Sequence, residues 1–189
     1  MIRFGPNQGK ILVAGEVSLL TMHVPGGNEY PRNGTEIYDP LSNTFQLGPQ
    51  MNSGRYWYTA TVIGAGVNAG KILLVGGLLQ DHERVRTPLA STELYDPATN
   101  TFAPPRATAT MKTARFSHTA SVITSGSNAG KILIAGGVVV QCDERGCETA
   151  LASSTELYDP AANRFIPGPR MRGAPGYLIA VQLPPAPPR

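Results

Sequence analysis

Short apolar runs that end in glycine alternate with polar, turn-rich segments along the whole chain. Near-continuous aliphatic runs occur at residues 9–16, 70–77 and 130–137, where the sequence reads GKILVAGE, GKILLVGG and GKILIAGG. Runs of this length and composition are typical of strands that are buried on both faces of a sheet. No segment shows the i, i+3, i+4 spacing of an amphipathic helix over two or more turns. The pattern therefore predicts a protein built from short strands.

A second segment alternates polar and apolar positions and is also written three times, as GTEIYDPLSNTF, STELYDPATNTF and STELYDPAANRF. In the middle copy, Thr92 and Leu94 face one way and Glu93 faces the other, which predicts a half-buried strand. The Asp-Pro that follows predicts a tight turn, because aspartate can bond its own downstream backbone, proline presets φ, and the later asparagine tolerates unusual dihedral angles. The short piece around NTF predicts a fourth, weaker strand.

The third landmark is a methionine, followed four residues later by an arginine and then by a Thr- and Val-rich run, YTATVI or HTASVI. Such runs are typical of strands. The last copy keeps an apolar run but has Pro175 at the arginine position. The copies start at Met51, Met111 and Met171, and their predicted strands span residues 58–63, 118–123 and 178–183.

The order of these landmarks resembles the kelch repeat, and the resemblance covers essentially residues 9–183. It implies an all-β, kelch-type β-propeller with four-stranded blades. With strands lettered in the family's usual order, the chain reads BCD-ABCD-ABCD-A, with blades at about 9–55, 56–115 and 116–183. It departs from the family where Glu16 replaces a glycine, and where Phe45, Phe102 and Phe165 stand in place of tryptophan.

Three blades do not close a ring, because propellers typically have about 4–8 blades. An open arc of three blades would expose two apolar sheet faces. Two interpretations stay open. Either two chains assemble head to tail around a two-fold axis into a six-bladed ring, with residues 178–183 of each completing the first blade of the other, or the sequence is a piece of a longer propeller. We expect the proline-rich tail, residues 184–189, to be mobile.

Composition excludes several classes of partner. Hydrophobic residues make up 41% of the chain and charged residues 15%, which argues against a disordered protein. The net charge is +3 and the basic residues are scattered, so the footprint of a nucleic-acid binder is missing. No stretch reaches the roughly 20 apolar residues that span a bilayer. The first residues lack the apolar core and cleavage site of a signal peptide.

Residues that recur identically are interpreted as structural, because a catalytic residue needs to appear only once. The glycine pairs permit positive φ and the close approach of a neighbouring blade. The tyrosines pack between blades with a hydroxyl partner, and the aspartates cap turns. This set comprises Gly76, Gly77, Gly136, Gly137, Tyr38, Tyr95, Tyr158, Asp39, Asp96 and Asp159.

The copies differ most between strands B and C, at residues 16–33, 78–90 and 138–153. A repeat scaffold that varies one set of loops usually binds through them, so we expect a module that binds a protein or a carbohydrate. Arg55 and Arg115 enter strand A, where they either line the channel mouth and contact the ligand or form structural bridges with glutamates. The expected ligand contacts are Arg55, Arg115, Tyr58, His118, Tyr30, His82, Arg84 and Arg86.

Cys142 and Cys147 share the third variable segment, in QCDERGC. A pair of cysteines supplies only two metal ligands and no histidine lies near, which disfavours a metal site. A disulfide and two free thiols both stay open. A disulfide would indicate a secreted protein in an oxidising compartment, and free thiols would indicate the cytoplasm.

Enzymes form the alternative function class: a copper radical oxidase similar to galactose oxidase, a kelch-type sugar epimerase, or an inactive fragment of one. The resemblance to galactose oxidase implies a site of two histidines and two tyrosines, one of them cross-linked to a cysteine. His23, His82 and His118 fall in different landmarks, and both cysteines share one segment. We therefore predict no catalytic residue, no cofactor and no metal ligand.

Overall fold

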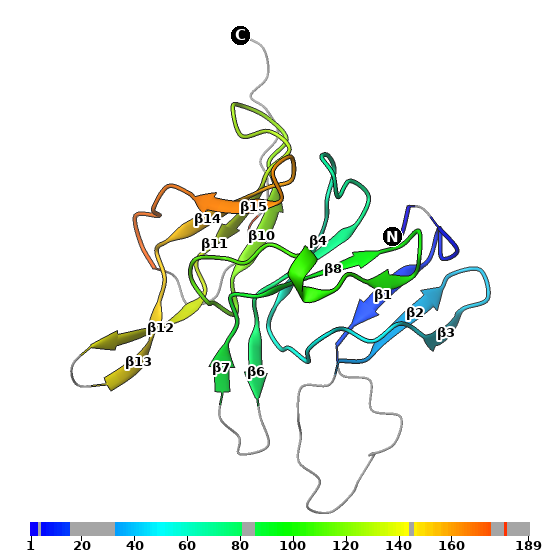
Figure 1. The fold of residues 1–189 in the computed structure, drawn as a ribbon, viewed down its shortest axis with the longest axis horizontal. Helices are drawn as coiled ribbons and strands as arrows, with labels where there is room; N and C mark the ends of the chain where they lie inside the picture. Colours follow the sequence, from blue (N-terminus) through cyan, green and yellow to red (C-terminus); the bar gives the residue numbers. More distant parts are fainter. Residues whose placement is uncertain (4, 16–32, 81–85, 144–145, 175–179, 181–189) are drawn as a thin grey trace, which may run out of the picture.

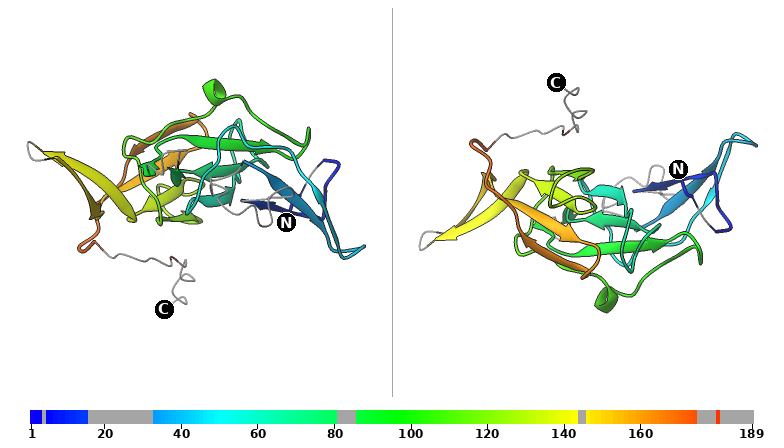
Figure 2. Two further views of the ribbon diagram at one scale, coloured as in Figure 1. Left: turned by 90° about the horizontal axis from the view of Figure 1, so that it is seen from below. Right: turned by 90° about the horizontal axis from the view of Figure 1, so that it is seen from above.

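In the computed structural model, three antiparallel sheets set in a row form the main body of the chain, and two further two-stranded sheets are hairpins attached to it (Figure 1). The structure describes residues 1–3, 5–15, 33–80, 86–143, 146–174 and 180. The first sheet lies at one end of the row and the β12–β13 hairpin at the other (Figure 2). The strands of the first sheet are β1 (Ile11–Ala14), β2 (Thr35–Asp39) and β3 (Thr44–Leu47), in that order.

The second and third sheets each contain four strands in chain order, apart from a hairpin inserted between the second and third strands. This matches the A-B-C-D order that the sequence predicts. The second sheet consists of β4 (Thr59–Val62), β5 (Ile72–Val75), β8 (Thr92–Asp96) and β9 (Thr101–Phe102). The third consists of β10 (Thr119–Val122), β11 (Ile132–Ala135), β14 (Thr155–Asp159) and β15 (Arg164–Pro167).

The inserted hairpins occupy two of the variable segments, which sequence analysis treated as loops. In Figure 1 the β6–β7 hairpin projects below the second sheet, and the β12–β13 hairpin projects outward at the end of the row. They are β6 (Leu78–Gln80) with β7 (Arg86–Pro88), and β12 (Val138–Asp143) with β13 (Gly146–Leu151). A short 3₁₀ helix, η1 (Pro105–Ala107), lies between β9 and β10. No helix among the described residues is long and apolar enough to cross a membrane.

The tight turn after each TEIYD or TELYD strand has the chemistry that the sequence indicated. In the second sheet, Asp96 Oδ1 accepts the backbone N–H of Ala98 at 2.9 Å, and Asn100 adopts φ 56. The hydroxyl of Tyr95 donates to Asn100 Oδ1 at 2.9 Å, so the turn is also tied to the strand before it. The same bonds recur at Asp39 with Leu41, Asp159 with Ala161, Tyr38 with Asn43 and Tyr158 with Asn163.

The core lies between neighbouring sheets. Each sheet has a tyrosine face, with residues Ile11, Tyr38 and Phe45, or Ile72, Tyr95 and Phe102, or Ile132, Tyr158 and Phe165. The opposite, leucine face carries Leu12 and Ile37, or Leu73 and Leu94, or Leu133 and Leu157.

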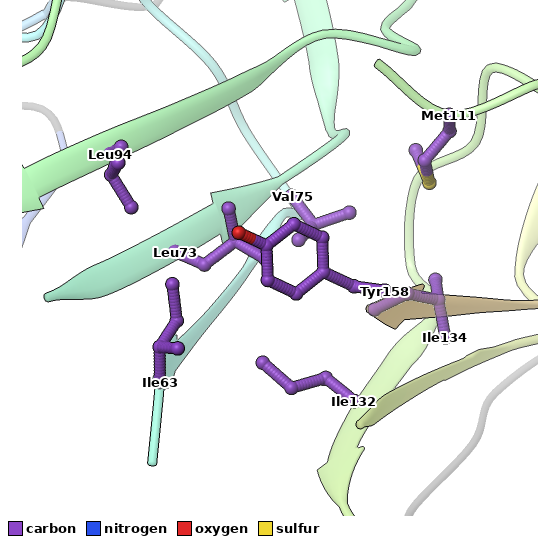
Figure 3. Close-up of a cluster of buried hydrophobic side chains, with 8 residues drawn as sticks. All are labelled: Ile63, Leu73, Val75, Leu94, Met111, Ile132, Ile134 and Tyr158. Carbon is purple, nitrogen blue, oxygen red and sulfur yellow. The ribbon is translucent and has the colours of Figure 1, made fainter. Parts of the chain in front are cut away.

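The tyrosine face of one sheet packs on the leucine face of the sheet before it. Tyr95 of the second sheet packs against Ile37 of the first. Tyr158 of the third sheet packs among Leu73 and Leu94 of the second (Figure 3). Both tyrosines are fully buried. The middle sheet is therefore covered on both sides.

Two predictions of burial are wrong, and for the same reason. The first four residues of β8 and of β14 are all buried rather than half-buried. For β8 the reason is that neighbouring sheets pack on both of its faces. Conversely, β1 alternates between exposed and partly buried positions, although its apolar sequence predicted burial on both faces. No described sheet covers the tyrosine face of the first sheet.

Several predictions fall outside the described residues. They concern Glu16, Pro175, the strand at residues 178–183 apart from Ala180, and the tail at residues 184–189.

Candidate functional site

Three aromatic side chains gather at the base of the hairpins. The backbone of Tyr56 exchanges two hydrogen bonds with Leu78, the first residue of β6, at 2.8 and 2.9 Å. Phe116 does the same with Val138, the first residue of β12, at 2.8 and 3.1 Å. These bridges hold the residues just before strands β4 and β10 against the start of each hairpin.

Trp57 lies between these two bridges and its side chain is 56% exposed. Its ring is stacked on Phe116, with centroids 5.6 Å apart and an interplanar angle of 28°. Tyr56 flanks it at 6.5 Å. We call Tyr56, Trp57 and Phe116 the aromatic platform.

The backbone of Trp57 is left-handed, with φ 50. Bulky residues rarely adopt this conformation because of a steric cost. The equivalent residue in the third sheet, Ser117, has φ 52 and donates its N–H to the carbonyl of Trp57 at 2.9 Å. The fold thus needs the left-handed turn at this position, but serine satisfies it at lower steric cost than tryptophan.

A groove of about 570 Å³ lies beside the platform, between β1 and β4. Trp57, Tyr58, Ala60 and Val62 line one wall and the residues of β1 line the other. The hydroxyl of Tyr58 crosses the groove and donates to the carbonyl of Ala14. Burial raises the pKa of Tyr58 to about 12, partly opposed by the charge of Arg55. Tyr58 therefore stays protonated and acts as a hydrogen-bond donor at neutral pH.

Arg55 is buried in an ion pair with Glu93, at 3.2 Å. Its Nη1 donates to the carbonyls of Gly76 and Ser91, at 2.7 and 3.1 Å. Glu93 in turn accepts the backbone N–H of Ser53 at 2.8 Å. Burial lowers the pKa of Arg55, an effect opposed by the charge of Glu93.

The same arrangement recurs in the third sheet. Arg115 pairs with Glu156 at 3.4 Å and donates to the carbonyl of Gly136 at 2.8 Å. Burial likewise lowers the pKa of Arg115, against the opposing effect of Glu156. Both guanidinium groups are enclosed by the chain's own carbonyls and carboxylates. These contacts are those of the structural Arg–Glu ion pair, one of the two interpretations of the sequence. Both arginine side chains are buried away from any ligand.

His118 occupies the position of Tyr58 in the third sheet and is also buried. Its Nε2 lies 3.0 Å from Thr59 Oγ1 of the second sheet. Burial lowers the pKa of His118 from 6.5 to about 4, and the charge of Arg115 lowers it further in the same direction. The imidazole is therefore neutral at neutral pH and joins two sheets.

The glycine pairs lie where neighbouring backbone comes close. A Cβ on Gly77, which has φ 104, would lie 2.6 Å from the carbonyl oxygen of Tyr56. A Cβ on Gly76 would lie 2.5 Å from the carbonyl oxygen of Arg115. Gly136 and Gly137 also have positive φ. Side chains at these positions would push the platform residues away from the hairpins.

The remaining predicted contacts divide into two groups. Arg86 is exposed at the start of β7. Tyr30, His82 and Arg84 lie outside the described residues. The platform residues Tyr56, Trp57 and Phe116 were not predicted, although Trp57 is the chain's single tryptophan and follows Arg55 closely.

Cys147 is disulfide-bonded. The register of β12 and β13 places Cys142, the other cysteine of the chain, directly opposite it. The part of the chain that the structure describes contains no cluster of three or more His, Cys, Asp or Glu residues able to hold a metal ion.

No family model matches the chain. In three dimensions the chain is similar to the solved structure of YjhT, a kelch-type propeller protein, with a TM-score of 0.57 and 13% sequence identity. The match covers 74% of this chain and 45% of YjhT, so the chain spans less than half the length of that protein. The likeness shows an all-β fold of the propeller type.

Replacing Glu93 by glutamine is expected to lower the free energy of unfolding by about 3–5 kcal/mol, because Arg55 would stay buried without its counter-charge. Urea unfolding followed by circular dichroism measures this loss. The matched control is Glu36→Gln, at the same repeat position in the first sheet, where the side chain is partly exposed. Its loss is expected to stay below about 1 kcal/mol. Equal losses in the two variants would contradict a special role for the buried pair.

Stability is expected to fall with acidification because of His118. The unfolded state takes up a proton near pH 6.5 and the folded state only near pH 4, so the unfolded state binds more protons between these values. The loss from this group amounts to about 3 kcal/mol over that interval. His118→Gln removes the titration, and urea unfolding at each pH should show a correspondingly shallower loss. Parallel pH profiles for the two proteins would disprove the assignment.

Proposed function

We propose that the chain is a kelch-type propeller segment that binds a protein or carbohydrate partner on the side carrying the hairpins. The aromatic platform forms the centre of the binding surface. The observation that carries this proposal is the exposed, left-handed Trp57, stacked on Phe116.

The platform has the properties of a recognition surface. Tryptophan and tyrosine dominate the energetics of interfaces, because they supply a large contact area at a low cost in conformational entropy. The fold does not require tryptophan at this position, since Ser117 makes the equivalent turn. An exposed aromatic residue retained against a backbone cost is best explained by a ligand that stacks on it.

The surroundings define the type of ligand. The hairpins β6–β7 and β12–β13 begin at the platform and can form walls on either side of a bound partner. Arg86 adds a positive charge that is exposed to solvent. We infer a partner with a flat apolar surface, such as the face of a sugar ring or an aromatic side chain, next to polar or acidic groups.

Catalysis by a sugar-modifying enzyme is the second candidate, favoured by the resemblance of the sequence to galactose oxidase-like propellers. The buried, neutral His118 and the enclosed Arg–Glu pairs leave no acid–base pair on the platform among the described residues. His23 and His82, which a copper site would need, lie outside them. We therefore derive no catalytic step.

The disulfide at Cys147 supports an oxidising compartment, because such bonds persist in secreted proteins and are rare in the cytosol. Glycans and the exposed surfaces of other proteins are the partners available there.

The single tryptophan gives a direct test. Glycan and peptide arrays probed with the tagged protein identify ligands, and titration of the best ligand should change the fluorescence of Trp57. Trp57→Ala is expected to weaken binding about 30-fold or more, the loss typical of a central aromatic contact. Val67→Ala, an exposed change in the turn before β5 and outside the hairpins, is the control and should leave affinity unchanged. Undiminished binding by the Trp57→Ala protein would refute the platform.

A further inference from the structure

Apolar residues on the sheet faces at the two ends of the row are more exposed than the equivalent residues inside the row. Tyr95 and Tyr158 are 0% exposed, whereas Tyr38, at the same position in the first sheet, is partly exposed. On the same face Phe45 is 57% and Leu47 is 64% exposed. The tyrosine face of the first sheet is thus an apolar surface without a described neighbour.

The leucine face of the third sheet is its counterpart. Leu73 and Ile63 of the second sheet are each 1% exposed under the third sheet. Their equivalents Leu133 and Ile123 are only partly buried, whereas Leu157, the equivalent of Leu94, is 5% exposed. The residue types match, because Ile123, Leu133 and Leu157 repeat Ile63, Leu73 and Leu94. Likewise Ile11, Tyr38 and Phe45 repeat Ile72, Tyr95 and Phe102. The two end faces therefore have the composition of the two halves of an interface that the chain already contains.

A contact between turns shows the same periodicity. The backbone of Pro97 leaves no room for a Cβ on Gly5, and the backbone of Pro160 leaves none on Gly66. Each glycine belongs to the turn before a B strand, and each proline to the Asp-Pro turn of the next sheet. The third such glycine, Gly126, has nothing within 4 Å of its Cβ position.

The proline at the equivalent turn of the first sheet is also without a packed neighbour among the described residues. Pro97 and Pro160 are buried, but Pro40 in the first sheet is exposed. A second copy of the chain would place its Pro40 against Gly126.

A polar contact repeats with the same period. Asn68 Nδ2 donates to the hydroxyl of Tyr158 in the next sheet, at 3.4 Å. Asn7 makes the equivalent contact with Tyr95. Asn128 follows in the series and faces no further sheet among the described residues, and Tyr38 is the corresponding acceptor at the opposite end.

One edge of β1 also lacks a paired strand among the described residues. In the second sheet, Leu73 and Val75 pair with residues of β4, whereas the equivalent Leu12 and Ala14 have no such strand beside them in the described part of the chain. The amide of Ile2 bonds Lys10 at 2.7 Å, as Ile63 bonds Lys71 at 2.9 Å. Met1 and Ile2 thus stand where a strand A ends, and the groove beside β1 lies where the rest of that strand would run.

We propose that two copies of this chain associate around a two-fold axis, the leucine face of the third sheet of each covering the tyrosine face of the first sheet of the other. Gly126 of one copy packs on Pro40 of the other, and Asn128 bonds Tyr38. The product is a closed ring with two identical interfaces and no free sheet face.

The choice of a second copy as the occupant rests on complementarity. Both end faces belong to this chain, and each matches the surface that covers its equivalent inside the chain.

Light scattering coupled to size exclusion tests the proposal. The wild-type protein should have twice the 20.0 kDa mass of one chain. Gly126→Asn should give a single chain that remains folded by circular dichroism, because asparagine tolerates φ 78 and open space surrounds this position within one chain. In the dimer, by contrast, the new side chain would collide with Pro40.

Gly130→Asn is the matched control. This glycine lies in the same turn, has φ 85 and also has open space around it. Its equivalent Gly9 contacts nothing even though a following sheet is present, so the substitution should leave the dimer intact. Phe45→Lys provides a second disruption, from the other side of the interface.

A wild-type protein that stays a single chain up to about 100 μM would overturn the proposal and would indicate that other segments, such as further blades of a longer protein, cover the end faces. A mass above that of two chains would also overturn it, since the ring would not close at two. A dimer unaffected by both Gly126→Asn and Phe45→Lys would show that the copies associate elsewhere.

Discussion

The stacking of one sheet face on the next is the interaction on which the rest of the structure depends. A four-stranded sheet of two- to five-residue strands encloses no core, and Tyr95 and Tyr158 become fully buried only against the preceding sheet. Burial of apolar surface is worth about 25 cal/mol per Å². As in other repeat proteins, stability is therefore a sum of contacts between neighbours, and each sheet depends on those beside it.

Buried charge then fixes the connections between sheets. Arg55 holds the carbonyls of Gly76 and Ser91, while Glu93 holds the amide of Ser53. The connector that ends at Trp57 is thereby tied to two strands of its own sheet. Because Arg115 does the same before Phe116, the distance between the two stacked rings is set by the interior of the protein rather than by flexible loops.

The strands and turns could be predicted from the sequence because their signals are local. An aliphatic run, a period of two and an Asp-Pro turn need no knowledge of the neighbouring sheet. The full burial of β8 could not be predicted, because it depends on sheets that lie on both sides of that strand. Similarly, the hairpins lie where the copies differ, so the comparison of repeats carried no information about them.

The candidate site was harder to predict for a related reason. Trp57 occurs once, and comparing the copies cannot single out a residue without a counterpart. Its left-handed backbone, and the bond that its carbonyl accepts from the N–H of Ser117 in the next sheet, leave no local signal in the sequence. The sequence allowed Arg55 to be either a ligand contact or part of a structural ion pair. The choice between them required the distances from its guanidinium group to Glu93 and Gly76.

The bridges at the base of the hairpins also separate hairpin length from sheet geometry. Strands β6 and β12 differ in length, at 3 and 6 residues, yet β5–β8 and β11–β14 keep the same four-residue register. A longer or shorter hairpin therefore begins at the same position in the sheet. The molecule thus offers a defined attachment site for sequences of very different size, a property that suits both natural diversification and the grafting of foreign peptides.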